Sequence, residues 1–238
     1  MLLHYLLALG CVFVWGCTFI SSKILLQAGL QPVDILLLRF GMAYLLLLPF
    51  YRKHLRLPSW KDEAWMIFLG ITGGSLYFLT ENTAIKYTLT TNASLIVSLT
   101  PLYTMLLMRV VKRKSTHLSS RMLIGSLLAV IGVFSVVMNG HILLELNPLG
   151  DFLSLLSGLC WSFYSLAYCY VAQKWSALLI TRNLFFWGFI TAIPFAFAES
   201  SLSHASLAFA QPVVWGNLLF LGIVASLLCF FGWNVAVS

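Results

Sequence analysis

The sequence predicts an all-α integral membrane protein, built as a polytopic helical bundle. Of its 238 residues, 61% are hydrophobic and only 9% are charged, whereas soluble domains contain about 25% charged residues. The high apolar content also excludes a disordered chain. A net charge of +7 would suggest nucleic-acid binding in a soluble protein. Here the charges lie in short segments between apolar runs, so we expect a lipid bilayer and no nucleic acid as partner.

Eight apolar runs are long enough to be membrane spans. They cover residues 3–22, 33–51, 64–83, 90–109, 121–138, 149–171, 182–198 and 214–235. The segments that connect them are short, so we predict no separate soluble domain on either side of the membrane.

The distribution of basic residues predicts the orientation of the chain. Eleven of the fourteen Lys and Arg residues lie in or beside the segments that follow the second, fourth and sixth runs. The positive-inside rule places those segments in the cytoplasm. With an even number of spans, we expect a multi-pass protein of the cell (plasma or inner) membrane with both termini cytoplasmic.

The two ends of the chain resemble each other. Landmarks of the first half recur in the same order in the second: Trp15 and Trp161, Arg39 and Arg182, Phe68-Leu69-Gly70-Ile71 and Phe220-Leu221-Gly222-Ile223, Asn82 and Asn234. The last two pairs share a constant offset of 152 residues. A unit of five spans reverses direction in the membrane, so the repeats are inverted, as in many secondary transporters. Residues 1–140 form the first repeat and residues 141–238 an incomplete second one, for which the pattern predicts two further helices.

Several stretches resemble the drug/metabolite transporter superfamily, EamA-type family. They are Trp15-Gly16, Arg39-Phe40, the run from Asn82 to Thr88 (NTAIKYT) and the run from Thr91 to Pro101 (TNASLIVSLTP). The resemblance implies ten helices in two inverted five-helix repeats, cytoplasmic termini and movement of small metabolites, often outward. Against that pattern, we expect the second EamA-like repeat to be truncated here, without counterparts of helices 9 and 10. A non-transporting or accessory membrane subunit, or an inactive fragment, is therefore the alternative. A homodimer or a partner would then cover the surface left open.

Glu81 is the ionisable residue that most suggests chemistry within a span. Polar groups in lipid are costly unless they face a cavity or one another. The carboxylate could bind a cationic substrate group or a proton, with Tyr77 one turn earlier on the same face. The alternative is a helix-end Glu that reaches interfacial water and pairs with Lys86. Arg39, six residues into its span, is expected to extend outward or to pair with Asp34.

Polar and aromatic residues at helical spacing complete the candidate substrate-binding set. Such stripes are either packing surfaces or cavity walls, and the hydroxyls and amides among them could instead hydrogen-bond between helices. Pro101 frees the carbonyl of Val97, which can kink that span or turn it toward a cavity. The candidates for the cavity are Trp15, Thr18, Tyr77, Glu81, Asn92, Ser94, Ser98, Trp161, Tyr164, Tyr168 and Asn234.

These observations predict a secondary transporter, most simply an exporter, of small metabolites. The two repeats would alternate access to a midplane cavity lined by the spans at 3–22, 64–83, 90–109, 149–171 and 214–235. Glu81 is the candidate for proton coupling, and uniport is equally compatible. Enzyme motifs are absent and the five histidines are isolated, so we expect no enzyme activity, no cofactor and no metal site.

Overall fold

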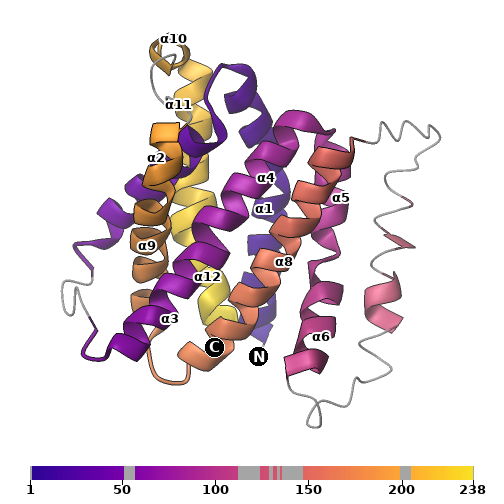
Figure 1. The fold of residues 1–238 in the computed structure, drawn as a ribbon, viewed down its shortest axis with the longest axis vertical. Helices are drawn as coiled ribbons and strands as arrows, with labels where there is room; N and C mark the ends of the chain where they lie inside the picture. The colour runs from indigo at the N-terminus through magenta and orange to yellow at the C-terminus, as the bar shows by residue number, and fades with distance from the viewer. Residues whose placement is uncertain are drawn as a thin grey trace.

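The computed structural model describes residues 2–50, 57–111, 124–128, 131–132, 135, 147–198 and 205–237. Within these ranges the chain forms helices and no strand (Figure 1). The helices of the first half are α1 (Leu2–Gln27), α2 (Pro32–Leu47), α3 (Trp60–Gly70), the π-helix η1 (Ile71–Ser75), α4 (Leu76–Tyr87), α5 (Thr90–Ser98) and α6 (Thr100–Val111). The second half contains α8 (Pro148–Val171), α9 (Ala177–Ala198), α10 (Ala205–Phe209), α11 (Pro212–Leu219), the π-helix η2 (Phe220–Leu228) and α12 (Cys229–Ala236).

Five helical stretches are long and apolar enough to cross a membrane. They are Leu2–Gln27, Thr90–Val111, Pro148–Val171, Ala177–Ala198 and Pro212–Ala236. This confirms a helical multi-pass architecture. α2 is shorter, with 16 residues, and the predicted span at 121–138 lies mostly outside the described residues. The count of eight spans therefore stays a prediction.

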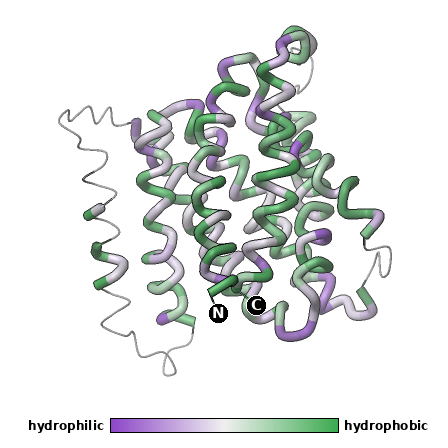
Figure 2. The backbone as a smooth tube through the Cα atoms, turned by 180° about the vertical axis from the view of Figure 1, so that it is seen from behind, coloured by the Kyte–Doolittle hydropathy of each residue, from purple (hydrophilic) through white to green (hydrophobic). Residues whose placement is uncertain are grey.

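The helices run side by side, and both termini lie at the same end of the bundle (Figure 1). Hydrophobic residues cover most of the helix lengths, while hydrophilic residues gather mostly near the helix ends (Figure 2). Across an 18-residue apolar stretch of α1, only 11% of the residues are buried inside the protein. Such an exposed apolar surface is expected for a helix that faces lipid.

Helices of the first half of the chain pack against helices of the second half. α4 packs on α8, α2 on α9 and on η2, and α1 on α12. Gly70 and Gly188 allow α3 and α9 to approach closely, because a Cβ atom built on Gly70 would lie 2.9 Å from the Gly188 backbone nitrogen. Small residues at such crossings let membrane helices pack closely.

The two π-helical segments occupy corresponding places in the chain. η1 covers Ile71–Ser75 and η2 covers Phe220–Leu228, which overlap under the 152-residue offset found in the sequence. A π segment turns the following residues to a different face of the helix and often marks a functional region. The residues that follow each segment, in α4 and α12, lie next to the cavity described below. The assignment of two inverted repeats, with its boundary near residue 140, remains a prediction.

The span predicted at 90–109 is broken into α5 and α6. Leu99 ends α5, and the hydroxyl of Thr100 donates a hydrogen bond to the Val97 carbonyl oxygen. Pro101 has no N–H to offer that carbonyl, so the side chain of Thr100 satisfies it. The break turns Val97, Thr100 and Pro101 toward the interior cavity.

Candidate functional site

A cavity of about 730 Å³ lies between the helices of the bundle and is open at its edge, where the lining residue Val12 is 54% exposed. All five spans that the sequence analysis proposed as cavity walls contribute to it, and α2 adds Arg39. Its lining is largely apolar and aromatic, with a few hydroxyls and two charged side chains. The lining residues are Val12, Trp15, Gly16, Thr18, Phe19, Arg39, Tyr77, Phe78, Glu81, Ser94, Val97, Ser98, Thr100, Pro101, Thr104, Met105, Met108, Trp161, Ser165, Phe230 and Trp233.

Aromatic rings from four helices, α1, α4, α8 and α12, form one continuous wall. Trp15 of α1 meets Trp161 of α8 edge to face, with ring centroids 5.2 Å apart. Trp233 of α12 lies 5.3 Å from Trp15, and Tyr77 lies 5.1 Å from Trp161. The indole N–H of Trp15 donates to the carbonyl oxygen of Ala225 at 3.0 Å. This contact fixes the ring against η2, whose π-helical turn presents that carbonyl.

Glu81 is a buried member of the lining, with 3% of its surface exposed. Its Oε1 accepts a hydrogen bond from the hydroxyl of Tyr77 at 2.6 Å. The ammonium group of Lys86 donates instead to the side-chain oxygen of Gln31 at 3.0 Å. The carboxylate therefore faces the interior rather than interfacial water.

Arg39 is also buried, with 1% of its surface exposed. Its Nε donates to the hydroxyl of Ser226 in η2 at 2.9 Å, and its Cζ lies 4.1 Å from the centroid of the Phe78 ring. The side chain does not extend outward to the membrane surface. α2 begins at Pro32, and its Gln31–Asp34 capping box fixes where the helix starts. Arg39 thereby lies about two turns inside the bundle.

Seven of the eleven candidate residues line the cavity: Trp15, Thr18, Tyr77, Glu81, Ser94, Ser98 and Trp161. The hydroxyls of Thr18, Ser94 and Ser98 each donate to a carbonyl three residues earlier in their own helix. Their oxygens remain able to accept a further hydrogen bond.

The other four candidates lie outside this lining. Tyr164 and Tyr168 turn to α12, where their hydroxyls donate to the Asn234 side-chain oxygen at 2.7 Å and to its carbonyl oxygen at 2.6 Å. The Asn234 amide in turn donates to the hydroxyl of Thr181 at 2.9 Å. These residues form a buried network that ties α8, α9 and α12 together. Asn92, 4% exposed, is likewise buried away from the cavity.

Several lining residues were missed by the sequence analysis. Thr104, Met105 and Met108 follow the break in the helix, on the α6 side of the cavity. The hydroxyl of Thr104 donates to that of Ser162 at 3.0 Å and joins α6 to α8. Trp233 occupies the position that corresponds to Glu81 under the 152-residue offset, and Phe230 the one that corresponds to Phe78. The internal repeat could therefore have predicted that Trp233 and Phe230 line the cavity.

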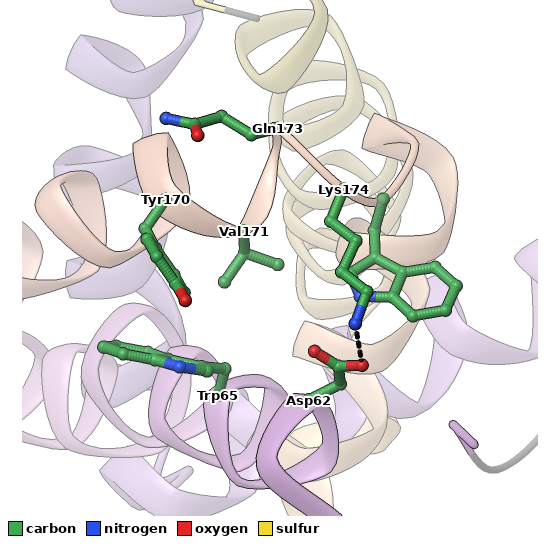
Figure 3. Close-up of a pocket in the computed structure, with 7 residues that line it drawn as sticks. Asp62, Trp65, Tyr170, Val171, Gln173 and Lys174 are labelled. Carbon is green, nitrogen blue, oxygen red and sulfur yellow. Dashed lines mark hydrogen bonds and ion pairs between the residues drawn. The ribbon is translucent and has the colours of Figure 1, made fainter. Parts of the chain in front are cut away.

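A smaller pocket of about 200 Å³ lies where α3 begins and α8 ends, at the end of the bundle that carries the termini (Figures 1 and 3). The rings of Trp65 and Tyr170 face each other there with centroids 5.1 Å apart. Lys174 forms an ion pair with Asp62 (Figure 3), and its Nζ lies 5.3 Å from the centroid of the Trp175 ring. These contacts connect the first half of the chain to the turn between α8 and α9.

Comparison with known proteins gives the family. The model of the EamA-like transporter family matches residues 2–138. The chain belongs to this family. An uncharacterized transporter of Archaeoglobus fulgidus is 29% identical over 99% of the chain and 80% of its own length. The uncharacterized transporter YyaM of Bacillus subtilis is 26% identical over 98% of the chain and 77% of its length.

A solved structure shares the fold. A crystal structure superposes with a TM-score of 0.72 at 20% identity, covering 98% of this chain and 78% of that one. Family and fold together support a multi-pass membrane transporter. Among the residues that the structure describes, no group of three or more His, Cys, Asp or Glu side chains could hold a metal ion.

Proposed function

We propose that this EamA-like protein exports small organic metabolites, with the 730 Å³ cavity as its substrate site. The observation that carries the proposal is the composition of that cavity, in which aromatic rings surround a few hydroxyls and two charged groups. Ligand sites are mostly apolar with a small number of polar groups that orient the ligand. The volume of the cavity lies in the range of pockets that bind small organic molecules.

The proposed mechanism is alternating access between the two inverted repeats. Contacts between the halves would then break and re-form on opposite sides of the cavity. The Lys174–Asp62 ion pair and the Trp65–Tyr170 contact join the halves at the end that carries the termini. We assign that end to the cytoplasm, because the segments rich in Lys and Arg belong to the same side. In this account these contacts close the cytoplasmic end while the cavity faces outward.

Glu81 has the proposed role of a proton- or cation-binding group. A carboxylate inside a membrane bundle that lines a cavity marks a candidate ion pathway. Its hydrogen bond with Tyr77 survives protonation of the other carboxylate oxygen, because Oε1 can still accept. Substrate release and proton binding could therefore occur without disrupting the wall of the cavity.

Uptake into proteoliposomes tests the proposal. Purified protein is reconstituted, and the entry of a panel of labelled amino acids, amines and organic acids is measured against empty liposomes. The proposal predicts saturable flux of at least one substrate. Trp161→Ala, which removes the centre of the aromatic wall, should abolish that flux.

Trp215→Ala is the matched control, because Trp215 is 51% exposed and lies outside the cavity lining. It should transport like the unsubstituted chain. Equal flux from Trp161→Ala and Trp215→Ala would contradict the assignment of the cavity as the substrate site.

A further inference from the structure

Arg39 lines the cavity, and its guanidinium has a buried donor group without a hydrogen-bond partner. Arg39 lines the cavity and is 1% exposed. Its Nε is bonded to Ser226, but its buried Nη1 has no hydrogen-bond partner in the protein. An arginine guanidinium carries five N–H donors and stays charged. A buried charged donor without a hydrogen-bond partner costs free energy. An acceptor that binds beside Arg39 would recover part of that free energy.

Neighbouring side chains do not supply that acceptor. Phe78 offers the face of its ring, at 4.1 Å from the Arg39 Cζ. Glu81, the acid of the same cavity, accepts from the Tyr77 hydroxyl. Among the described residues no ion pair joins Arg39 to Glu81. The other titratable groups near Arg39 are the Tyr77 hydroxyl, which donates to Glu81, and the thiol of Cys229 on α12, which is a poor acceptor.

We propose that Arg39 binds the carboxylate of the substrate, and that this protein therefore carries organic monocarboxylates with an apolar body. The proposal rests on the proposed function in one respect, that the cavity is the substrate site. A carboxylate matches the fork of a guanidinium and forms charge-assisted hydrogen bonds with it. The rings of Trp15, Trp161 and Phe230 provide the apolar surface that the rest of the molecule would contact.

The charge balance of the cavity favours a single negative charge on the ligand. Arg39 is the one cation in the lining, and Glu81 is the one acid. A dianion such as a phosphate monoester would bring a second charge into an apolar space with no further cation to compensate it. With Glu81 protonated, the guanidinium of Arg39 leaves one positive charge in the lining, which a single carboxylate on the ligand neutralises.

Ligand binding by the purified protein tests this subsite without requiring transport. The probes are 3-phenylpropanoate and its neutral analogue 3-phenylpropanamide, which have nearly the same shape. Binding is followed by the fluorescence of the cavity tryptophans in detergent-solubilised full-length chain. The unsubstituted protein should bind the carboxylate about 10- to 100-fold more tightly than the amide, the range expected for a hydrogen bond to a charged group.

Arg39→Gln should remove that preference and leave the affinity for the amide within about 2-fold of its original value. The matched control is Arg182→Gln, since Arg182 is the equally buried counterpart on α9 and lies outside the cavity lining. It should retain the preference for the carboxylate. A preference that persists in Arg39→Gln would overturn the proposal.

Glu81→Gln provides a second test, in case Arg39→Gln fails to fold. Removing the negative charge from the same cavity should tighten binding of the carboxylate by about 10-fold and leave the amide unaffected. Unchanged or weakened binding of the carboxylate would overturn the subsite. Binding of the amide but not of the carboxylate would also overturn the carboxylate subsite. In that case, saturable flux of another substrate would still support the proposed transport function. Failure of the folded protein to bind either probe counts against the subsite as well.

Discussion

The indole rings of Trp15 and Trp161, 146 positions apart in the sequence, meet edge to face at 5.2 Å with an angle of 80° between their planes. They are the two residues that the sequence comparison aligned as counterparts in the first and second halves. Their contact lies on the cavity wall. If one half of the chain moves against the other, the distance between these two rings changes, and so does the shape of the cavity wall.

Trp15→Phe should lower stability modestly, because it keeps an aromatic ring but removes the N–H donated to the Ala225 carbonyl. We expect a loss of about 0.5–1.5 kcal/mol, measured by unfolding in mixed micelles. Trp215→Phe is the control, since its indole N–H also donates to a carbonyl, that of Phe209, but from an exposed position. Equal stability of Trp15→Phe and the unsubstituted protein would argue against an anchoring role for this hydrogen bond.

Asn234→Leu should be more destabilising than any substitution of an exposed amide. It removes the acceptor of the Tyr164 hydroxyl and the amide that donates to the Thr181 hydroxyl, both inside the bundle. We expect a loss of about 2–3 kcal/mol in the same assay. Asn217→Leu, at a half-buried position of α11 where the amide donates only to its own helix, should cost little. If the two variants are equally stable, the network does not hold α8, α9 and α12 together.

Gly70→Ala should impair folding, because the new Cβ would lie 2.5 Å from the Cβ of Trp187 and 2.9 Å from the backbone nitrogen of Gly188. Backbone cannot move aside as a side chain can, so α3 and α9 would have to separate. The control Gly216→Ala meets no atom within 4 Å and should be neutral or slightly stabilising. Yield and monodispersity on size-exclusion chromatography report the result. A monodisperse Gly70→Ala protein with normal stability would show that α3 and α9 do not need this close approach.

Glu81→Gln should remove the pH dependence of flux while preserving the fold, because an amide oxygen can still accept from the Tyr77 hydroxyl. The measurement is the initial rate of uptake between pH 5.5 and 8 (roughly the physiological range around neutrality). Flux that varies with pH in both the unsubstituted protein and Glu81→Gln would exclude Glu81 as the proton-binding group. A matched substitution is Glu63→Gln. The carboxylate of Glu63 accepts from the Trp187 indole outside the cavity, so it should leave the pH dependence intact.

The sequence was sufficient to predict a helical membrane bundle and much of the cavity. Hydropathy identified the apolar segments, and helical spacing placed Trp15, Trp161 and Glu81 among the candidates for the cavity wall. These features depend on local periodicity, which is visible within a single span. The EamA-like family followed from short stretches of the first half, where the family model also matches.

The remaining features depend on contacts between distant parts of the chain. Tyr164 and Tyr168 lie on the same stripe as Trp161, yet they bond to Asn234, and periodicity cannot show which neighbour a stripe faces. Arg39 was expected at the membrane surface or beside Asp34, whereas it reaches Ser226, 187 positions later in the sequence. That contact depends on how η2 packs against α2, which the spacing of residues does not reveal.

The most direct test of the central claim is the accessibility of the cavity from each side of the membrane. Ser98 lines the cavity, and its hydroxyl bonds only within its own helix, so Ser98→Cys is a conservative probe. Labelling by a membrane-impermeant thiol reagent is measured in right-side-out and in inverted vesicles, as the increase over the native cysteines. Alternating access predicts labelling from both faces, and protection by a saturating transported substrate. Labelling from one face only, unaffected by substrate, would contradict a cavity that opens in turn to the two sides.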